Sequence, residues 1–217
     1  MRSVAHVARM TPLFTLLLLG PAEAAGQALR APEGWIARPE RFVEMPPGWH
    51  ITTGRGVILY HPEAQAAGSF ELESEGYLFD PEGREGHYGL ILGGRDLDSD
   101  AQRYVAFEIG PDGDYAIRQQ AEYQSTDLAT GRHEAILRWT GDEPTVRNVL
   151  GVRAGESMVR FVVNGVTVAE LPRSRVEPEG IVGFRVDAGT NLHITTLDVS
   201  AGGSKRSWAP VPPAEGD

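Results

Sequence analysis

The 217-residue chain contains no cysteine, and Lys205 is its only lysine. Without cysteine no disulfide staples the fold, and at this length a single hydrophobic core can suffice instead. The chain also lacks amphipathic segments with the 3.6-residue period of a helix. This leaves β-strands as the expected elements.

Several catalytic motifs are missing as well. The six histidines show neither HxH nor HExxH spacing, so a zinc site is not expected. No G-x-S-x-G elbow occurs, and nothing else indicates a nucleophilic triad. Gly93-Gly94 lies within a strand pattern with no helix after it, which argues against a phosphate-binding loop.

Acidic residues outnumber basic ones by 30 to 20, and the formal net charge is -10. A chain this acidic is a poor candidate for electrostatic binding to nucleic acid or to anionic lipid. No nucleic-acid partner is therefore expected.

Residues 1–25 have the features of an export signal. Arg2 and Arg9 form a basic start, Leu13 to Leu19 a short apolar run, and Ala22-Glu23-Ala24 a small-x-small cleavage pattern. The apolar run is short for a bilayer span, although a retained membrane anchor is the alternative. We therefore expect a periplasmic or secreted protein with no membrane insertion after cleavage.

The rest of the chain is predicted to form three parts. Residues 26–40 are expected to be an extended lead-in, residues 41–200 a single β-sandwich domain, and residues 201–217 a flexible tail rich in proline and glycine.

Short apolar or alternating runs with turn signals at regular spacing fill the central part. Asn164-Gly165 joins two apolar runs and supplies the positive φ angles of a type I′ hairpin. A long strand over residues 69–79 alternates, with Phe70, Leu72 and Leu78 on one face. Further strands are expected at 41–45, 56–60, 88–94, 103–109, 115–119, 133–139, 146–152, 182–186 and 192–199. The pattern predicts an all-β, two-sheet antiparallel sandwich or jelly roll.

The order of the segments is similar to that of a known group of folds. The segments are GWHITTG (48–54), FELE (70–73), GLILGG (89–94), FEIGPDGDYAI (107–117), VRFVVNGVTV (159–168) and EGIVGFRV (179–186). This order resembles the concanavalin A-like and laminin-G-like jelly rolls, and among them the secreted bacterial domain labelled 3-keto-disaccharide hydrolase. The resemblance implies a concanavalin A-like sandwich and an exported protein related to sugar-binding or sugar-cleaving proteins. It implies no particular activity, because one fold hosts many functions.

Glu71, Glu73 and Glu75 follow at a period of two and project from one strand face. Laminarinase-type glycosidases of the same broad fold carry a similar E-x-D-x-E pattern, whose outer carboxylates act as nucleophile and general acid. The resemblance therefore implies Glu71 and Glu75 as catalytic residues, since close like charges raise one pKa as an acid requires. Glu73 stands where that pattern has aspartate, and a solvated strand face is the alternative.

Asp96, Asp98 and Asp100 alternate in a predicted loop and offer hard oxygen ligands to calcium, the one cofactor considered. Laminin-G-like domains often hold calcium at a sandwich rim, so the resemblance implies such a site. The loop lacks the glycine and the distal glutamate of an EF-hand, and an acidic solvated turn is the alternative.

Sugar recognition combines an aromatic platform with charged groups that hold hydroxyls. Trp49 and Tyr104 are candidate platforms, and Glu73, Glu108 and Arg118 are candidate polar groups. Tyr104 and Glu108 share a face of one strand, and Arg118 projects from the strand paired with it. Core packing is the alternative for Trp49.

Three functions remain open. The first is a non-catalytic exported module that binds a carbohydrate or similar small polar ligand on one sheet face. The second is a glycoside-cleaving enzyme, either a glycosidase or a 3-keto-glycoside hydrolase. The third is a structural domain of the envelope whose partner is another envelope protein.

Overall fold

The structure is a computed structural model that describes residues 41–79 and 86–208. The predicted signal at 1–25 and the predicted lead-in at 26–40 lie outside the described residues. Fifteen strands and one short helix, α1 (Arg173–Val176), make up the described part. Within those residues no helix has the length and apolar character needed to cross a membrane.

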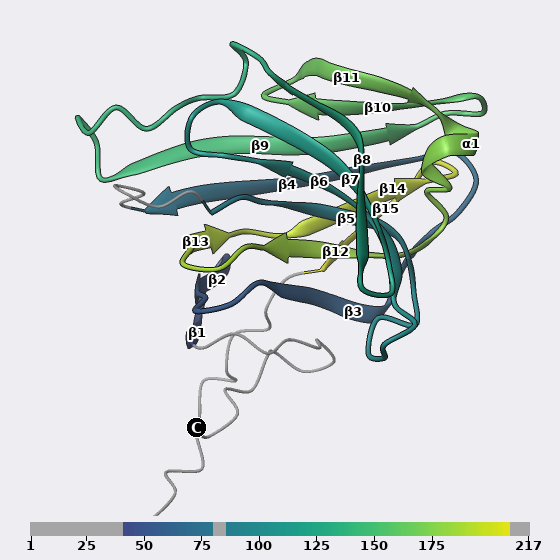
Figure 1. Cartoon of the computed structure of the whole chain (residues 1–217), viewed down its shortest axis with the longest axis horizontal. Helices are drawn as coiled ribbons and strands as arrows, with labels where there is room; N and C mark the ends of the chain where they lie inside the picture. The colour runs from purple at the N-terminus through teal and green to yellow at the C-terminus, as the bar shows by residue number, and fades with distance from the viewer. Residues whose placement is uncertain (1–40, 80–85, 209–217) are drawn as a thin grey trace, which may run out of the picture.

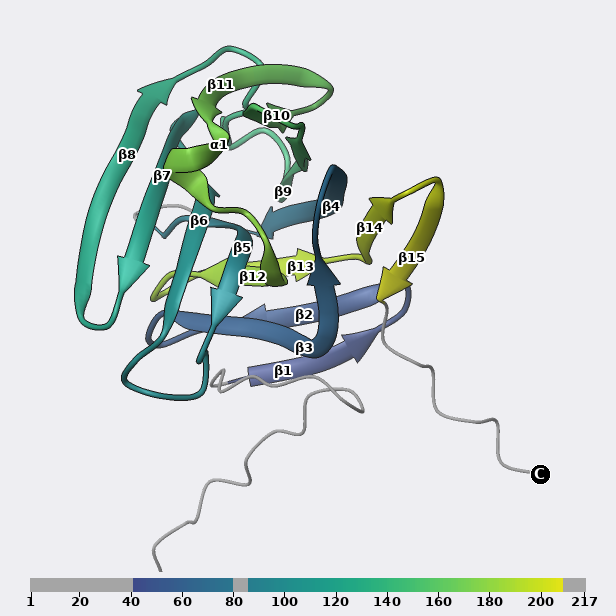
Figure 2. The same ribbon diagram turned by 90° about the vertical axis from the view of Figure 1, so that its right-hand side faces the viewer.

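The strands form two antiparallel sheets that face each other (Figure 1). The six-stranded sheet has the order β3-β12-β5-β6-β7-β8, and Figure 2 shows it running from β8 at the left to β3 below. Its strands are β3 (Val57–Ala66), β12 (Gly180–Val186), β5 (Tyr88–Arg95), β6 (Arg103–Ile109), β7 (Asp114–Ala121) and β8 (Gln124–Arg132).

The nine-stranded sheet has the order β1-β2-β13-β4-β9-β10-β11, with β14 paired to both β4 and β15. Its strands are β1 (Arg41–Met45), β2 (Gly48–Thr52), β13 (Asn191–Ile194), β4 (Phe70–Phe79), β9 (Thr145–Ala154), β10 (Met158–Val163), β11 (Val166–Pro172), β14 (Leu197–Ala201) and β15 (Ser204–Trp208). The predicted strand over 192–199 is in fact two, β13 and β14, which pair with different parts of β4.

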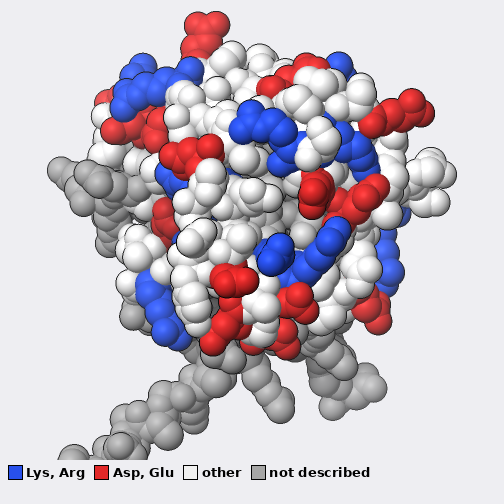
Figure 3. Space-filling model, turned by 45° about the vertical axis from the view of Figure 1, so that its right-hand side comes forward, with Lys and Arg blue, Asp and Glu red and all other residues white. Residues whose placement is uncertain are grey.

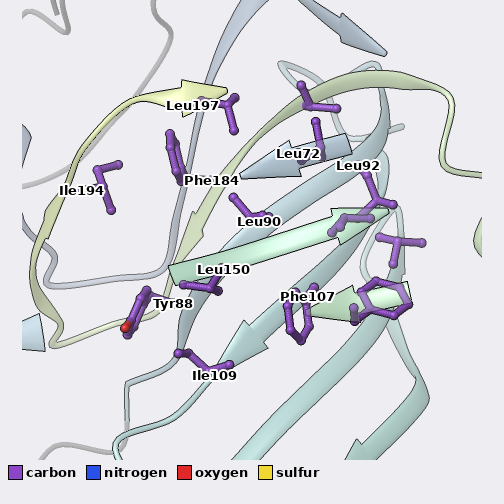
Figure 4. Packing of buried hydrophobic residues seen from close by; sticks show 14 of the residues in the cluster. Leu72, Tyr88, Leu90, Leu92, Phe107, Ile109, Leu150, Phe184, Ile194 and Leu197 are labelled. Atoms are coloured by element: carbon purple, nitrogen blue, oxygen red, sulfur yellow. The ribbon is translucent and has the colours of Figure 1, made fainter. Parts of the chain in front are cut away.

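The core lies between the sheets, where the inward side chains of both meet (Figure 4). Phe107 of β6 contacts Phe161 of β10 with 5.2 Å between ring centroids, and Trp49 of β2 meets Phe184 of β12 edge-on at 6.4 Å. Alternation decides which side chains enter the core, because successive residues of a strand point to opposite faces. The predicted two-sheet antiparallel sandwich is confirmed.

The predicted hairpin at Asn164-Gly165 is also confirmed, since φ is 50° at Asn164 and 83° at Gly165. The Asn164 side chain has a second role. Its Oδ1 accepts from the Val149 amide at 2.8 Å, and its Nδ2 donates to Ala135 O and to Asn148 Oδ1, both at 2.8 Å. The turn thereby holds the segment between β8 and β9 against the sandwich.

One strand prediction in this region is wrong, and one strand was not predicted. Residues 133–139 form no strand; only Ile136 of this segment is fully buried, and hydrogen bonds to Asn148 and Asn164 hold the backbone instead. The polar stretch before them, where no strand is expected from the sequence, is β8. Because β8 is an edge strand with both faces largely exposed, it carries no apolar alternation by which it could have been recognised.

The predicted start of the flexible tail at residue 201 is wrong as well. The chain pairs onward as β15, which ends in Trp208, a residue that joins the core with only 9% of its surface exposed. Arg206 lies over the Trp208 ring at 4.1 Å and reaches Glu63 of β3. The sandwich therefore extends to Trp208, and residues 209–217 lie outside the described part.

Candidate functional site on the outer face of the six-stranded sheet

A floor of small residues crosses the middle of the outer face of the six-stranded sheet. One cross-strand row runs Arg185, Gly89, Glu108 and Ala116, on β12, β5, β6 and β7. The next row runs Gly183, Ile91, Ala106, Arg118 and Asp127, ending on β8. Close packing against neighbouring strands explains the glycines, since a Cβ at Gly89 would meet Phe107 O and one at Gly183 would meet Leu59 O.

Glu108 is the centre of a chain of ion pairs on this floor. Its side chain is only 3% exposed, and its Oε2 accepts from Arg118 Nη1 at 3.2 Å. Its Oε1 accepts no hydrogen bond from any described residue, and Arg185 Nε lies 4.0 Å from it. Arg118 Nε in turn donates to Asp127 Oδ1 at 3.0 Å.

The chain of ion pairs continues on the other side of Glu108. Arg185 Nη2 lies 3.0 Å from Asp187 Oδ1, and Arg185 Nη1 donates to the carbonyls of Val57 and Val186. His87 bridges the end, with Nε2 at 2.7 Å from Asp114 Oδ2 and Nδ1 at 3.9 Å from Asp187 Oδ2. We call the linked side chains the outer-face network: Asp127, Arg118, Glu108, Arg185, Asp187, His87 and Asp114.

Burial gives Glu108 unusual electrostatics. Desolvation raises the pKa of its carboxyl above the ordinary value of 4.5, and the nearby Asp187 raises it further, against the opposing effect of Arg185 and Arg118. A buried carboxylate with one unsatisfied oxygen has a free-energy cost that a structural ion pair does not need to incur. Such costs are concentrated at functional sites, which makes this network the leading candidate.

Beside the network the same outer face is apolar and covered. Leu97 folds back from the β5–β6 loop onto Tyr60, Ile91, Tyr104 and Ala106, each at most 8% exposed. Tyr104 is therefore correctly placed next to the network but cannot serve as an open stacking platform, contrary to the prediction. Its buried side chain interacts instead with Arg185.

The structure brings together only some of the predicted ligand-binding residues. Glu108 and Arg118 lie in the network and Tyr104 beside it, whereas Glu73 projects from β4 on the opposite face of the molecule. Trp49 is wrong as a ligand-binding residue, because it is fully buried in the core. Its tryptophan side chain fills the space between β2 and Phe184.

Sequence reasoning missed His87, Asp114, Asp127, Arg185 and Asp187. These residues lie outside the strand that carries Glu108, and the sequence does not show which strands and loops pack beside it. One signal was available in part: Asp114 and Arg118 lie on the strand returning from the Pro111–Gly113 turn, so pairing β6 with β7 could have placed them near Glu108. Arg185 requires knowledge that β12 pairs with β5.

Glu71, Glu73 and Glu75 do project from one face of β4, as predicted, on the outer side of the nine-stranded sheet. Glu75 accepts hydrogen bonds from Tyr77 and Arg147, and the bond from Arg147 holds the pKa of Glu75 below its ordinary value of 4.5. Glu71 faces Arg153 at 3.9 Å. A general acid needs a raised pKa, so the surroundings of Glu75 do not suit it for that role.

The calcium prediction is wrong for the described conformation. Asp96, Asp98 and Asp100 are exposed and do not converge, and no group of three acidic or histidine side chains suited to a metal occurs in residues 41–79 and 86–208. The loop closes on itself instead: Ser99 N and Oγ both donate to the Asp96 carbonyl. This turn directs Leu97 inward and spreads the aspartates in solvent.

A hollow of about 550 Å³ beside α1 is a weaker candidate. It is lined by Arg95 and Arg173 together with Glu156, Glu177 and Glu179. Arg173 already donates to the carbonyls of Gly155 and Gly68 and to Glu179, so its guanidinium joins three loops. Its structural role explains the cluster without a ligand.

Comparisons with known proteins agree on the fold and give no family. No family model matches the chain, and no curated protein matches its sequence. A carbohydrate-binding module, CBM66 from Bacillus subtilis, superposes with a TM-score of 0.62 at 13% identity, over 78% of this chain and 97% of that one. A Bacillus subtilis protein of unknown function with a galectin-like fold gives 0.57 at 13% identity, over 76% and 88%.

The calcium-bound exoplasmic/lumenal domain of VIP36 gives a TM-score of 0.58 at 10% identity, over 82% of this chain and 90% of that one. At these identities the likeness concerns the fold alone. The chain thus has the concanavalin A-like sandwich that its sequence predicts, and the comparisons add the likeness to a galectin-like fold. Its resemblance to the 3-keto-disaccharide hydrolase domain stays a prediction.

Proposed function

We propose that the protein is a non-catalytic carbohydrate-binding module and that the outer-face network is its binding site. The observation that carries the proposal is Glu108, a carboxylate almost fully buried beneath two arginines with one oxygen unsatisfied. Burying this carboxylate outside the core has a free-energy cost. Ligand recognition explains that cost better than a contribution to stability does.

The chemistry of the network suits a sugar. Alternating guanidinium and carboxylate groups present donors and acceptors at fixed positions, which is what two neighbouring hydroxyls need. The ion pairs hold the side chains in place before a ligand arrives, so less conformational entropy is lost on binding. Similar folds support the proposal: one solved relative is named as a carbohydrate-binding module, and VIP36 has been solved with mannose bound.

The catalytic alternative lacks comparable support, because the pKa of Glu75 is lowered where an acid would need it raised. With the export signal expected at residues 1–25, we propose that the module works in the periplasm or outside the cell. Its ligand would then be an extracellular or cell-wall glycan.

The proposal is tested by calorimetric titration with a panel of oligosaccharides against the wild type and two arginine variants. Arg118→Ala removes a network guanidinium, and Arg153→Ala, on the nine-stranded sheet, removes an ion-paired arginine from the opposite face. We expect Arg118→Ala to abolish binding and Arg153→Ala to preserve it, with circular dichroism showing that both fold. Binding that survives Arg118→Ala and fails in Arg153→Ala would place the site on the other sheet.

A further inference from the structure

The outer-face network carries more negative than positive charge. It contains four carboxylates, on Glu108, Asp114, Asp127 and Asp187, against the two guanidiniums of Arg118 and Arg185. Four minus two leaves two net negative charges when His87 is neutral and one when it is protonated. Figure 3 shows basic and acidic side chains lying next to one another over much of the face in view.

The positive groups of the network are already committed. Arg185 donates to two main-chain carbonyls and lies against Asp187, and Arg118 donates to both Glu108 and Asp127. The N–H groups that remain on each guanidinium can donate to neutral hydroxyls, because a guanidinium has five N–H donors. An incoming carboxylate or sulfate would instead compete with the carboxylates that both arginines already hold.

The acceptors, by contrast, keep capacity for a ligand. Asp114, Asp127 and Asp187 each take their short contact through a single oxygen, at 2.7, 3.0 and 3.0 Å. The side chains of these three aspartates are 31%, 59% and 30% exposed, so a ligand can reach them, whereas the Glu108 carboxylate is buried. A carboxylate has about four lone-pair sites, so the network can accept several more hydrogen bonds than it makes internally.

From this imbalance we propose that the site selects donor-rich sugars, neutral or carrying a protonated amine, and rejects sugars with a carboxylate or sulfate. The inference rests on the proposed function and specifies the ligand class of the same site. Hydroxyl and ammonium groups donate to the free carboxylate oxygens, whereas an anionic sugar meets net like charge in a partly desolvated setting.

The test is a glycan array with matched oligosaccharides of glucose, glucosamine and glucuronic acid, and the corresponding galactose series, followed by titration of any member that binds. We expect the uronic acid member of a series to bind at least about tenfold more weakly than its neutral or amino counterpart. Added salt should narrow that ratio, because it screens charge repulsion at an exposed face.

A pair of variants separates this selection from ordinary loss of binding. Asp127→Asn removes one network charge at an exposed position, and we expect it to reduce the discrimination against uronic acids severalfold. Glu71→Gln removes one charge from the opposite face and should leave the ratio unchanged. Uronic acids that bind as tightly as neutral sugars would overturn the selection yet leave sugar binding intact. A complete absence of binding across the array would contradict the proposed function itself.

Discussion

Glu108 of β6 holds Arg118 of β7 with one carboxylate oxygen, at 3.2 Å, and faces Arg185 of β12 with the other, at 4.0 Å. Glu108 and Arg118 come from consecutive strands, whereas Arg185 lies far along the sequence, and Gly89 of β5 lies in the row between Arg185 and Glu108. A single buried carboxylate thereby lies between the two guanidiniums on this face. In the proposed sugar-binding site, its charge is the central element.

Replacing that charge should affect ligand binding far more than folding. Glu108→Gln keeps the shape of the side chain but loses the attraction to both arginines, so we expect at least about a tenfold loss of sugar affinity. Titration calorimetry with a bound oligosaccharide measures the loss. Glu63→Gln removes a carboxylate that is paired with Arg206 away from the network, and it should bind as the wild type does. Equal affinities for wild type and Glu108→Gln would show that this carboxylate does not organise the site.

Two glutamates should give opposite pH dependences of stability. The folded-state pKa of Glu75 is lowered by its bond from Arg147, so its stabilising effect is present above about pH 4.5 and is lost as pH falls through the folded pKa. The folded-state pKa of Glu108 is raised by burial, so its contribution is fully present below 4.5 and is lost as pH rises through the folded pKa.

Urea unfolding of wild type, Glu75→Gln and Glu108→Gln between pH 3 and pH 7 measures how the unfolding free energy of each changes with pH. Relative to Glu75→Gln, the wild type should gain stability as pH rises through the acid range. Relative to Glu108→Gln, it should lose stability over the range above 4.5. Parallel curves for the two comparisons would contradict the assigned environments.

Gly76 of β4 should tolerate no side chain, although it lies in an extended strand. A Cβ built there would come within 2.6 Å of Tyr88 Cε2, and Tyr88 is a buried residue of the opposing sheet. We expect Gly76→Ala to lower the free energy of unfolding by roughly 1–3 kcal/mol, because an overfilled core forces side chains or backbone to shift. The double variant with Tyr88→Leu should lose less unfolding free energy than the two single variants lose together. Urea unfolding measures all three losses. Strict additivity would mean that the two residues do not compete for the same space.

Asn148 should be essential for the order of the segment between β8 and β9. It is 2% exposed, and its amide accepts from the Leu137 amide at 2.9 Å and donates to the Leu137 carbonyl at 3.1 Å. Asn148→Leu leaves both groups of Leu137 unpaired, at roughly 1–3 kcal/mol of stability for each group that stays buried. Hydrogen exchange should show faster exchange at the Leu137 amide and unchanged protection at Phe107. Unchanged protection at Leu137 would show that the segment is held by other contacts.

The sequence predicts this protein well where the pattern within one strand decides which of its side chains are buried. Alternation correctly placed Phe70, Leu72 and Leu78 inside and the glutamates of β4 outside, and Asn164-Gly165 correctly marked a tight hairpin. The same reasoning failed for β8, because an exposed edge strand has no buried face to leave a pattern. It failed again for β15, because four of its five residues are exposed and the strand shows no apolar alternation.

The candidate site was only partly predictable for a related reason. Glu108 and Arg118 belong to strands joined by one short turn, so local pairing brings them together. Arg185, Asp187 and His87 reach them only through the non-local pairing of β12 with β5, which a single sequence does not specify. Tyr104 was misjudged because alternation gives the face on which a side chain lies, whereas the covering Leu97 loop decides whether that face is open. Trp49 was misjudged because it points into the core.

The most direct test of sugar binding at the outer-face network is an amide NMR titration of the isotopically labelled protein with an oligosaccharide identified on the array. We predict that the chemical shifts which move are concentrated on β6, β7, β8 and β12, around Glu108, Arg118, Asp127 and Arg185. Amides of β4, β9 and β10, on the other sheet, should remain in place. Perturbations centred on β4 and β9 would contradict the account and return attention to Glu71, Glu73 and Glu75.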